Sequence, residues 1–193
     1  MLRASKPDQN GPRALRKACS PAPRLRAPVA GDAAPMWRLA VETGALDVNS
    51  PYAYVLVCTH FASTSLVAVD PEEPNDLVGF AAAYRTPDDL DVLFVWQIGI
   101  RAERRGAGLG GRLLRALLAQ PGNRGVRWVE ATVTPSNRAS ERLFHSFAQS
   151  LGVACEPTGS YPPELFPGGD HEPEVLYRIG PLSIDRNEMK RGR

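Results

Sequence analysis

The spacing of apolar residues along the chain predicts two helices followed by a group of short strands. The stretch APMWRLAVETGAL places Pro35 near a helix start and Gly44 as its C-terminal cap. A second helix is expected after Ser50, with Pro51 as its first residue, although its β-branched residues would also permit a strand. The pattern then changes to short apolar runs divided by turn residues. These runs predict strands at 64–70, 77–85 and 91–100.

The second half of the chain alternates between helical and strand patterns. A leucine stripe predicts a helix directly after a glycine-rich segment; it consists of Leu109, Leu113, Leu114 and Leu117. The elements expected after it are strand 126–133, a helix within 134–153 that is capped near Ser136, and strand 172–180. This order favours one α/β domain, with a mixed and mostly antiparallel central sheet flanked by helices.

Length and charge distribution support a single domain with polar ends. The chain of 193 residues is long enough for one domain with its own core, and it has no run of about 18 uncharged apolar residues. Residues 1–28 carry seven basic side chains and one acid, whereas 29–180 have a net charge of −6. We therefore expect a basic flexible extension at 1–25, a domain at 26–180 and a tail at 181–193. Such an extension can bind nucleic acid or anionic membrane, but its composition is more typical of a solvated tail, so neither partner is expected.

The three cysteines predict neither a disulfide framework nor a zinc knuckle, because Cys19, Cys58 and Cys155 are far apart and form no C-x-x-C pair. The first residues also lack the apolar core of a secretory signal. Both observations favour a reducing, cytoplasmic environment. Cys58 as a nucleophile of a two-step transfer is the weaker hypothesis, since it lies among apolar residues without an evident activating partner.

The segment RRGAGLGG, residues 104–111, is the strongest candidate for a ligand-binding loop. Glycines let the backbone approach a phosphate, and the N-terminus of the following helix offers free N–H groups. A Walker loop is excluded because Arg112 stands where that loop requires lysine and then a hydroxyl. The dinucleotide pattern G-x-G-x-x-G is matched from Gly106 onward, yet the loop follows an antiparallel meander instead of opening a parallel βαβ unit.

A third pattern, R/Q-x-x-G-x-G/A, is met by Arg105, Gly108 and Gly110. Together with the strand before it and the leucine-rich helix after it, this loop resembles the acetyl-CoA loop of the GNAT acetyltransferase superfamily. The stretch NRASERLF at 137–144 resembles the later N-x-x-A-x-x-L-Y motif of the same superfamily. The resemblance implies the GNAT fold and acetyl-CoA as co-substrate. The implied cofactor-binding residues are Ile98, Gly99, Ile100, Arg105, Gly106, Ala107, Gly108, Leu109, Gly110, Asn137 and Phe144.

Two consequences of this resemblance concern the chemistry of the transfer. Backbone N–H groups at a strand bulge around 98–100 are expected to meet the tetrahedral oxyanion. Phe144 stands where the superfamily often has a tyrosine that protonates the leaving thiolate. Another group must perform that step here, or the thiolate leaves unassisted, which its pKa of about 8 to 9 allows.

Two further stretches resemble the L-2,4-diaminobutyrate acetyltransferases of ectoine biosynthesis. They are LDVNSPYAYVLVCTHFASTSLVA at 46–68 and GGDHEPEVLYRI at 168–179, and the resemblance extends over about residues 25–180. It implies acetyl transfer from acetyl-CoA to the 4-amino group of diaminobutyrate for compatible-solute synthesis, by direct attack in a ternary complex, in a homodimer. The implied acceptor-site residues are Asp47, Tyr52, Trp96, His171 and Glu174, and all of them except Tyr52 are expected to be catalytic.

These residue types suit a substrate with two amines and one carboxylate, which needs carboxylates, a π surface and a few donors. An alkylammonium with a pKa of about 10.4 must lose a proton before it attacks, so a carboxylate such as Asp47 is expected to act as base, directly or through water. Asp47 could instead serve only the turn before NSP, and Trp96 only the core. The HEPE stretch shows no evident third metal ligand, so no metal is expected.

The sequence leaves three hypotheses for the function. The first is the diaminobutyrate acetyltransferase described above. The second is a GNAT enzyme that acetylates another small amine or a protein amine. The third is a CoA-binding regulatory module that uses the basic extension to bind a partner. Because the fold alone does not define the substrate, the acceptor site has to distinguish them.

Overall fold

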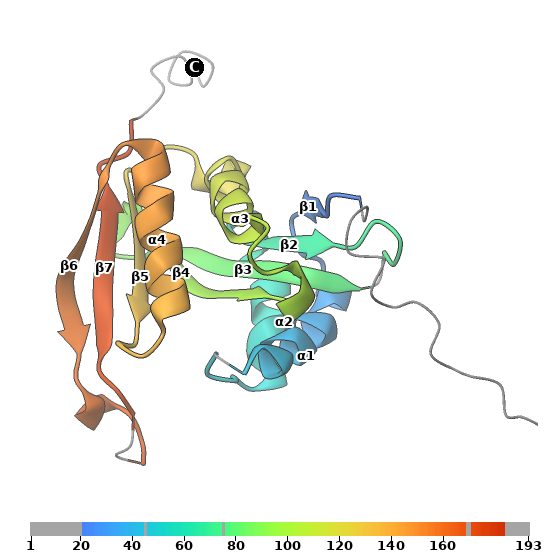
Figure 1. The fold of residues 1–193 in the computed structure, drawn as a ribbon, viewed down its shortest axis with the longest axis horizontal. Helices are drawn as coiled ribbons and strands as arrows, with labels where there is room; N and C mark the ends of the chain where they lie inside the picture. Colours follow the sequence, from blue (N-terminus) through green and yellow to red (C-terminus); the bar gives the residue numbers. More distant parts are fainter. Residues whose placement is uncertain (1–20, 45, 75, 169–170, 184–193) are drawn as a thin grey trace, which may run out of the picture.

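The computed structural model of the protein describes residues 21–44, 46–74, 76–168 and 171–183. One seven-stranded sheet runs through it in the order β1-β2-β3-β4-β5-β7-β6 (Figure 1). Neighbouring strands are antiparallel except β4 and β5, which are parallel, so the predicted mixed sheet is confirmed. The strands are β1 (Arg24–Arg26), β2 (Leu66–Val69), β3 (Leu77–Thr86), β4 (Asp89–Ile100), β5 (Trp128–Val133), β6 (Ala154–Tyr161) and β7 (Glu174–Gly180).

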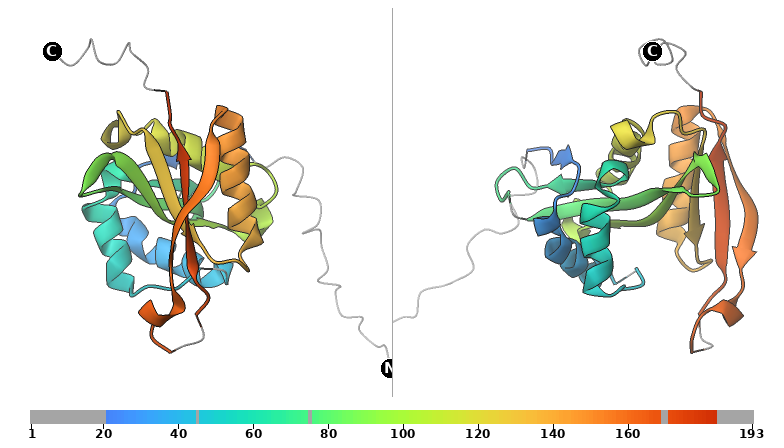
Figure 2. Two further views of the ribbon diagram at one scale, coloured as in Figure 1. Left: turned by 90° about the vertical axis from the view of Figure 1, so that its left-hand side faces the viewer. Right: turned by 180° about the vertical axis from the view of Figure 1, so that it is seen from behind.

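In the described ranges, four α-helices cover the sheet in two pairs, α1 (Ala33–Thr43) with α2 (Pro51–Thr59) and α3 (Leu109–Leu118) with α4 (Arg138–Leu151). The two pairs pack on opposite faces, as the views from the side and from behind show (Figure 2). Each pair has its own apolar core. Alternate residues of β3 serve the two cores, because successive side chains of a strand point to opposite faces: Ala81 contributes to the α3–α4 core, and Phe80 contributes to the α1–α2 core.

The helix boundaries follow the capping residues of the sequence closely. Ser50 precedes α2, α1 ends at Gly44 with a positive φ of 62°, and the Asn137 side chain caps α4 by accepting a hydrogen bond from the Ser140 N–H at 3.1 Å. The cap of α4 therefore lies one residue after the expected Ser136. None of the helices in the described ranges has the length and apolar character that crossing a bilayer requires.

Two strands were not predicted from the sequence. β1 pairs with β2, so the expected boundary between residues 25 and 26 falls inside the sheet. β6 is an edge strand that is largely exposed, and its register is irregular between Pro157 and Gly159. Proline and glycine disguise a strand in sequence, and an edge strand tolerates both because one side of it needs no ladder hydrogen bonds.

A β-bulge interrupts β4 at Trp96. Ala82 lies opposite Gln97 while the next residue, Ala83, lies opposite Val95, so Trp96 is the extra residue. The bulge was expected around 98–100 and is therefore two residues earlier than predicted. It reverses the alternation of β4: Val95 and Ile98 both contact the α3–α4 core, and Gln97 turns to the side of α2.

β4 and β5 separate after a short paired stretch. In the described chain, only residues 92–94 of β4 pair with residues 128–130 of β5. The Arg101 N–H donates to the Val78 carbonyl at 3.0 Å. Since antiparallel residues alternate between bonding the partner and facing away from it, the N–H groups of Ile98 and Ile100 face the gap instead of β3. The strands thus form a wedge with main-chain donors along one side.

Candidate active site

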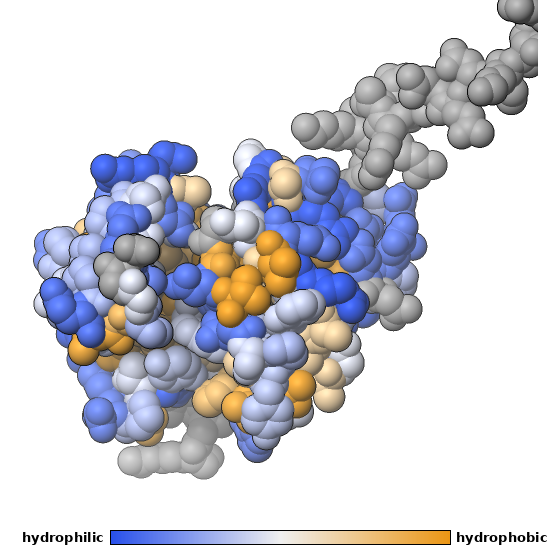
Figure 3. Space-filling model, turned by 90° about the horizontal axis from the view of Figure 1, so that it is seen from below, coloured by the Kyte–Doolittle hydropathy of each residue, from blue (hydrophilic) through white to orange (hydrophobic). Residues whose placement is uncertain are grey.

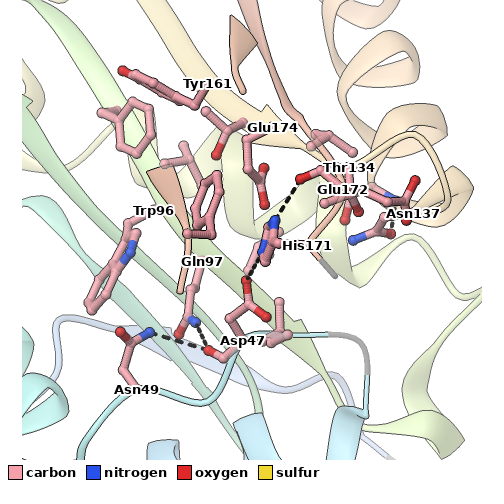
Figure 4. A pocket seen from close by; sticks show the side chains of 18 of the residues that line it. Asp47, Asn49, Trp96, Gln97, Thr134, Asn137, Tyr161, His171, Glu172 and Glu174 are labelled. Atoms are coloured by element: carbon pink, nitrogen blue, oxygen red, sulfur yellow. Dashed lines mark hydrogen bonds and ion pairs between the residues drawn. The ribbon is translucent and has the colours of Figure 1, made fainter. Parts of the chain in front are cut away.

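Two cavities open at the wedge between β4 and β5. The larger has a volume of about 820 Å³ and is lined by both strands, by the segment before α2 and by the segment before β7 (Figure 4). The smaller, of about 300 Å³, lies at the glycine loop before α3. Leu46, Ile98, Asn137 and Ser140 line both cavities, so the two meet at the wedge. This arrangement suits two ligands that must touch each other.

Asp47, His171 and Glu174 come together on one wall of the larger cavity. One side-chain atom of each residue, a histidine nitrogen or a carboxylate oxygen, lies within 4.8 Å of the corresponding atoms of the other two. His171 Nε2 is 3.2 Å from Asp47 Oδ2, although 124 positions separate the two residues in the chain. Asp47 precedes α2 and is 80% exposed as a side chain, whereas His171 is 22% exposed. The structure therefore assembles three of the predicted acceptor-site residues.

His171 is held in a defined orientation. Its Nδ1 lies 2.6 Å from the Glu172 carbonyl oxygen, which can only accept, so Nδ1 carries the hydrogen. The ring of Phe166 stacks on the imidazole with centroids 3.9 Å apart and planes 11° from parallel. The hydrogen bond to Glu172, and then the Asp47 carboxylate, raise the pKa of His171 above its usual value. Nε2 is left as the nitrogen that gains or loses a proton toward the cavity.

Glu174 and Glu172 add negative charge to the same wall. Burial raises the pKa of the half-buried Glu174 carboxyl, while the Thr132 hydroxyl and the nearby His171 act in the opposite direction. Glu172 Oε2 accepts a hydrogen bond of 3.1 Å from the Ser136 N–H, just before α4. This bond connects the acceptor wall with the helix start that also lines the smaller cavity. The wall is suited to a cationic ligand.

The two aromatic residues predicted for the acceptor site have different outcomes. Trp96 lines the larger cavity and is 36% exposed, so the bulge presents it to a ligand instead of burying it in the core. Tyr52 is 66% exposed on the first turn of α2 and is not among the lining residues of that cavity, so the structure does not bring it to the other four.

Sequence reasoning missed several residues of the cavity. Gln97 and Thr132 lie on strand faces whose direction depends on the bulge and on the end of β5. Tyr161 and Phe166 belong to the end of β6 and the segment after it, and β6 was not predicted. The only sequence signal for Tyr161 and Phe166 was that they are aromatic residues between two predicted elements, and they form no distinctive motif.

The glycine loop forms a wall of the smaller cavity. Gly106 and Gly108 have φ values of 75° and 76°, in the left-handed region that only glycine enters readily. Arg105 braces the loop, because its Nε donates to the Ile100 carbonyl at 2.9 Å. A Cβ on Gly110 would lie 2.9 Å from Leu143 Cδ1, so this glycine lets α3 approach α4 closely.

Ten of the eleven predicted cofactor residues line at least one of the two cavities, and Ala107 lines neither. Phe144 lines the larger cavity, but it is only 3% exposed and packs into the α3–α4 core. The position where the superfamily often has a tyrosine therefore holds a buried phenylalanine ring, which has no hydroxyl to protonate the thiolate. Arg104 also lines the smaller cavity and pairs with Asp70 at 2.7 Å.

Two alternatives from the sequence can be revised. Cys58 is 3% exposed in the α1–α2 core, and burial raises the pKa of its thiol to about 11, so it does not act as a nucleophile. The HEPE stretch was expected to lack a third metal ligand, and that premise was wrong, because Asp47 joins His171 and Glu174 at a spacing that could hold a cation. Neither the family nor the relatives described next indicate a metal-dependent enzyme.

The comparisons with known proteins agree with this geometry. The family model of the acetyltransferase (GNAT) family matches residues 34–148, and the chain belongs to that family. It is 46% identical over 155 residues to the L-2,4-diaminobutyric acid acetyltransferase of Halalkalibacterium halodurans, covering 80% of each chain. It is 44% identical over 157 residues to the enzyme of the same name from Streptomyces coelicolor, covering 81% of this chain and 91% of the relative. Within the GNAT family, the chain belongs with the diaminobutyrate acetyltransferases.

A solved structure supports the same placement. Diaminobutyrate acetyltransferase EctA from Paenibacillus lautus, in complex with L-2,4-diaminobutyric acid and coenzyme A, is 39% identical with a TM-score of 0.80. The match covers 86% of this chain and 99% of that one. The ribosomal-protein-S18-alanine N-acetyltransferase from Escherichia coli is 16% identical with a TM-score of 0.63, and this likeness concerns the fold alone.

Proposed function

We propose that this protein transfers the acetyl group of acetyl-CoA to the 4-amino group of L-2,4-diaminobutyrate, for the synthesis of the compatible solute ectoine. The observation that carries the proposal is the convergence of Asp47, His171 and Glu174 within 4.8 Å on the wall of a cavity that meets the glycine-loop cavity. The relatives with this activity, and the solved relative in complex with the diamine and coenzyme A, support it.

Acetyl-CoA, the acetyl donor, binds from the side of the glycine loop. The N-terminus of α3 and the loop N–H groups suit the pyrophosphate of acetyl-CoA. The pantetheine arm then follows the wedge, where the N–H groups of Ile98 and Ile100 face away from β3. These donors, just beyond the bulge at Trp96, are preorganised to stabilise the oxyanion that forms when the amine attacks the thioester.

The acceptor cavity selects a small diamine by its charge. Its described lining holds the carboxylates of Asp47, Glu172 and Glu174 and includes neither lysine nor arginine. Two amino groups complement that set, while the Trp96 indole offers an N–H donor for the single carboxylate of the substrate. A protein lysine presents one amine and an amide backbone, so it would leave part of the acidic wall unpaired.

The attacking amine must be neutral, and we assign its deprotonation to the Asp47–His171 pair. With Nδ1–H held by the Glu172 carbonyl, Nε2 is the nitrogen that accepts a proton, and Asp47 stabilises the imidazolium that results. Asp47 can also take the proton itself, because its carboxylate faces the same cavity. The CoA thiolate is a moderately weak base that needs little assistance to leave, consistent with a phenylalanine at 144.

The proposal is tested by incubating the purified chain with acetyl-CoA and a panel of amines, with products identified by mass spectrometry. Diaminobutyrate should have the highest kcat/KM, and ornithine, which is longer by one methylene, should be poorer by about 10- to 200-fold. Efficient acetylation of peptide amines with no acetylation of diaminobutyrate would transfer the function to protein acetylation. Coenzyme A binding without turnover of any amine would favour a regulatory module.

We further propose a cytoplasmic homodimer that serves osmoprotection. Large apolar side chains remain exposed around α2 and the β3–β4 turn, including Val55, Phe61 and Leu90, and such surfaces often bind a partner subunit. Seen from below, apolar side chains gather near the centre of the molecule between hydrophilic surfaces (Figure 3). Cys58 and Cys155 are free thiols, consistent with a reducing compartment. Light scattering on the protein as it elutes from a size-exclusion column tests this, because a dimer should have twice the mass of the single chain.

A further inference from the structure

A chain of hydrogen bonds runs beneath the acceptor wall from the α1–α2 core to the main chain of Asp47. The Tyr54 hydroxyl donates to Gln97 Oε1 at 3.0 Å, and Gln97 Nε2 donates to the Asp47 carbonyl oxygen at 2.7 Å. Tyr54 is 0% exposed and Gln97 is 7% exposed. Figure 4 shows Gln97 beside Asp47, with Asn49 donating to the same carbonyl from the other side. The segment that carries Asp47 thus rests on a buried amide.

The orientation of the Gln97 amide follows from its partners. The Asp47 carbonyl only accepts hydrogen bonds, so the NH₂ group of Gln97 must face it. The amide oxygen then faces the Tyr54 hydroxyl, which satisfies it as a donor. A flipped amide would place two acceptors 2.7 Å apart, which is costly for buried groups. Tyr54 and Gln97 therefore define one arrangement of the Asp47 main chain.

The β4 bulge explains why a glutamine reaches this position. With regular alternation, residue 97 would face the same core as Val95. The extra residue at Trp96 turns Gln97 to the α2 side, where Tyr54 lies, and places Trp96 at the cavity. One local irregularity thus supplies both an aromatic wall for the acceptor and a support for Asp47.

We propose that Gln97, oriented by Tyr54, is the positioning residue that holds Asp47 at the acceptor amine. This inference rests on the proposed function. Gln97 lines the larger cavity and does not line the glycine-loop cavity, so its loss should affect the diamine and leave acetyl-CoA binding intact. A role confined to folding would instead lower stability without separating the two Michaelis constants.

The test compares Gln97→Met, Tyr54→Phe and the double variant by steady-state kinetics with each substrate varied. Gln149→Met, on the exposed face of α4, is the matched control. Gln97→Met should lower kcat/KM for diaminobutyrate about tenfold or more, with KM for acetyl-CoA within twofold of the parent. Tyr54→Phe should lower it by a smaller factor, and adding it to Gln97→Met should cost less than twofold more, because the two act through one bond chain.

Gln97→Glu provides the second test, since it keeps the shape of the side chain and can still accept from Tyr54. Its carboxylate cannot donate to the Asp47 carbonyl, so the loss should match that of Gln97→Met. Values of kcat/KM for diaminobutyrate within twofold of the parent, an equal rise in both Michaelis constants, or additive effects of the two substitutions would overturn the inference. If Gln97→Met does not fold, the Tyr54→Phe kinetics decide by the same criteria. Absence of diaminobutyrate turnover in the parent chain would instead refute the proposed function.

Discussion

Replacing Asp47 by asparagine distinguishes two roles for its carboxylate. The substitution keeps the size of the side chain, and it keeps the Gln97 hydrogen bond because that bond uses the Asp47 main chain. Only the charge and the proton-accepting oxygen are lost. The variant therefore measures what the carboxylate does at the amine, separately from where the segment lies.

The magnitude of the loss separates the two roles. Asp47 is 80% exposed beside His171, and an exposed ion pair of this kind contributes at most about fivefold. A positioned proton acceptor typically contributes about 10²- to 10⁴-fold in rate. We expect kcat for diaminobutyrate acetylation to fall at least 100-fold, because the substrate amine must lose its proton at this wall.

The assay follows release of the free thiol of coenzyme A at saturating acetyl-CoA, with Asp88→Asn in the exposed β3–β4 turn as the control. The control should retain the parent kcat. A loss smaller than fivefold in Asp47→Asn would show that the carboxylate serves only as a neighbour of His171. The proton would then be accepted by His171 Nε2 without help from the Asp47 carboxylate, or by Glu174.

Three further predictions follow from the site. The pKa of His171 is raised, first by the Glu172 carbonyl and then by Asp47, so kcat/KM should rise as the pH increases through that pKa. Asp47→Asn should lower the His171 pKa and therefore move this rise in kcat/KM to lower pH. A pH–rate profile in which the rise stays in place or moves to higher pH would contradict the pairing of Asp47 with His171. Gly108→Ala should raise KM for acetyl-CoA by about 5- to 30-fold, because its φ of 76° costs alanine about 1–2 kcal/mol although no atom lies within 4 Å of the added Cβ. Gly125→Ala, with a φ of 77° outside the loop, should lower Tm and leave that KM unchanged. Equal KM values for acetyl-CoA in the two variants would refute a role of Gly108 in CoA binding. Dialysis against EDTA should leave turnover within twofold, measured by the same thiol assay, and a loss restored by a divalent cation would assign the acidic wall to a metal.

Apolar periodicity and capping residues were sufficient to predict the main elements of the fold. Pro51 and Gly44 mark helix ends in sequence because their backbone preferences act locally. β6 could not be found in this way, since Pro157 and Gly159 give it the composition of a loop and its pairing with β7 is a long-range property. Register is equally hidden from local patterns, and for that reason the bulge was expected two residues away from Trp96.

The candidate site was predictable in its residue types more than in its geometry. Asp47 and His171 were selected by resemblance, and no local pattern indicates that residues 124 positions apart meet. Gln97 went unnoticed because a lone glutamine in an apolar strand has no motif, and its role depends on the face to which the bulge turns it. Tyr52 shows the converse, since a residue identified by resemblance lies outside the cavity in the single chain.

The most direct test of the proposed chemistry is the position of the new amide bond. Diaminobutyrate labelled with ¹⁵N at the 4-amino nitrogen would be incubated with the enzyme and acetyl-CoA carrying ¹³C at the acetyl carbonyl, and the product examined by NMR. We predict a one-bond ¹³C–¹⁵N coupling in the product, because the wall of Asp47, His171 and Glu174 presents the 4-amino group to the thioester. A ¹³C-labelled product without that coupling would place the acetyl group on the α-nitrogen and contradict the proposed orientation of the substrate.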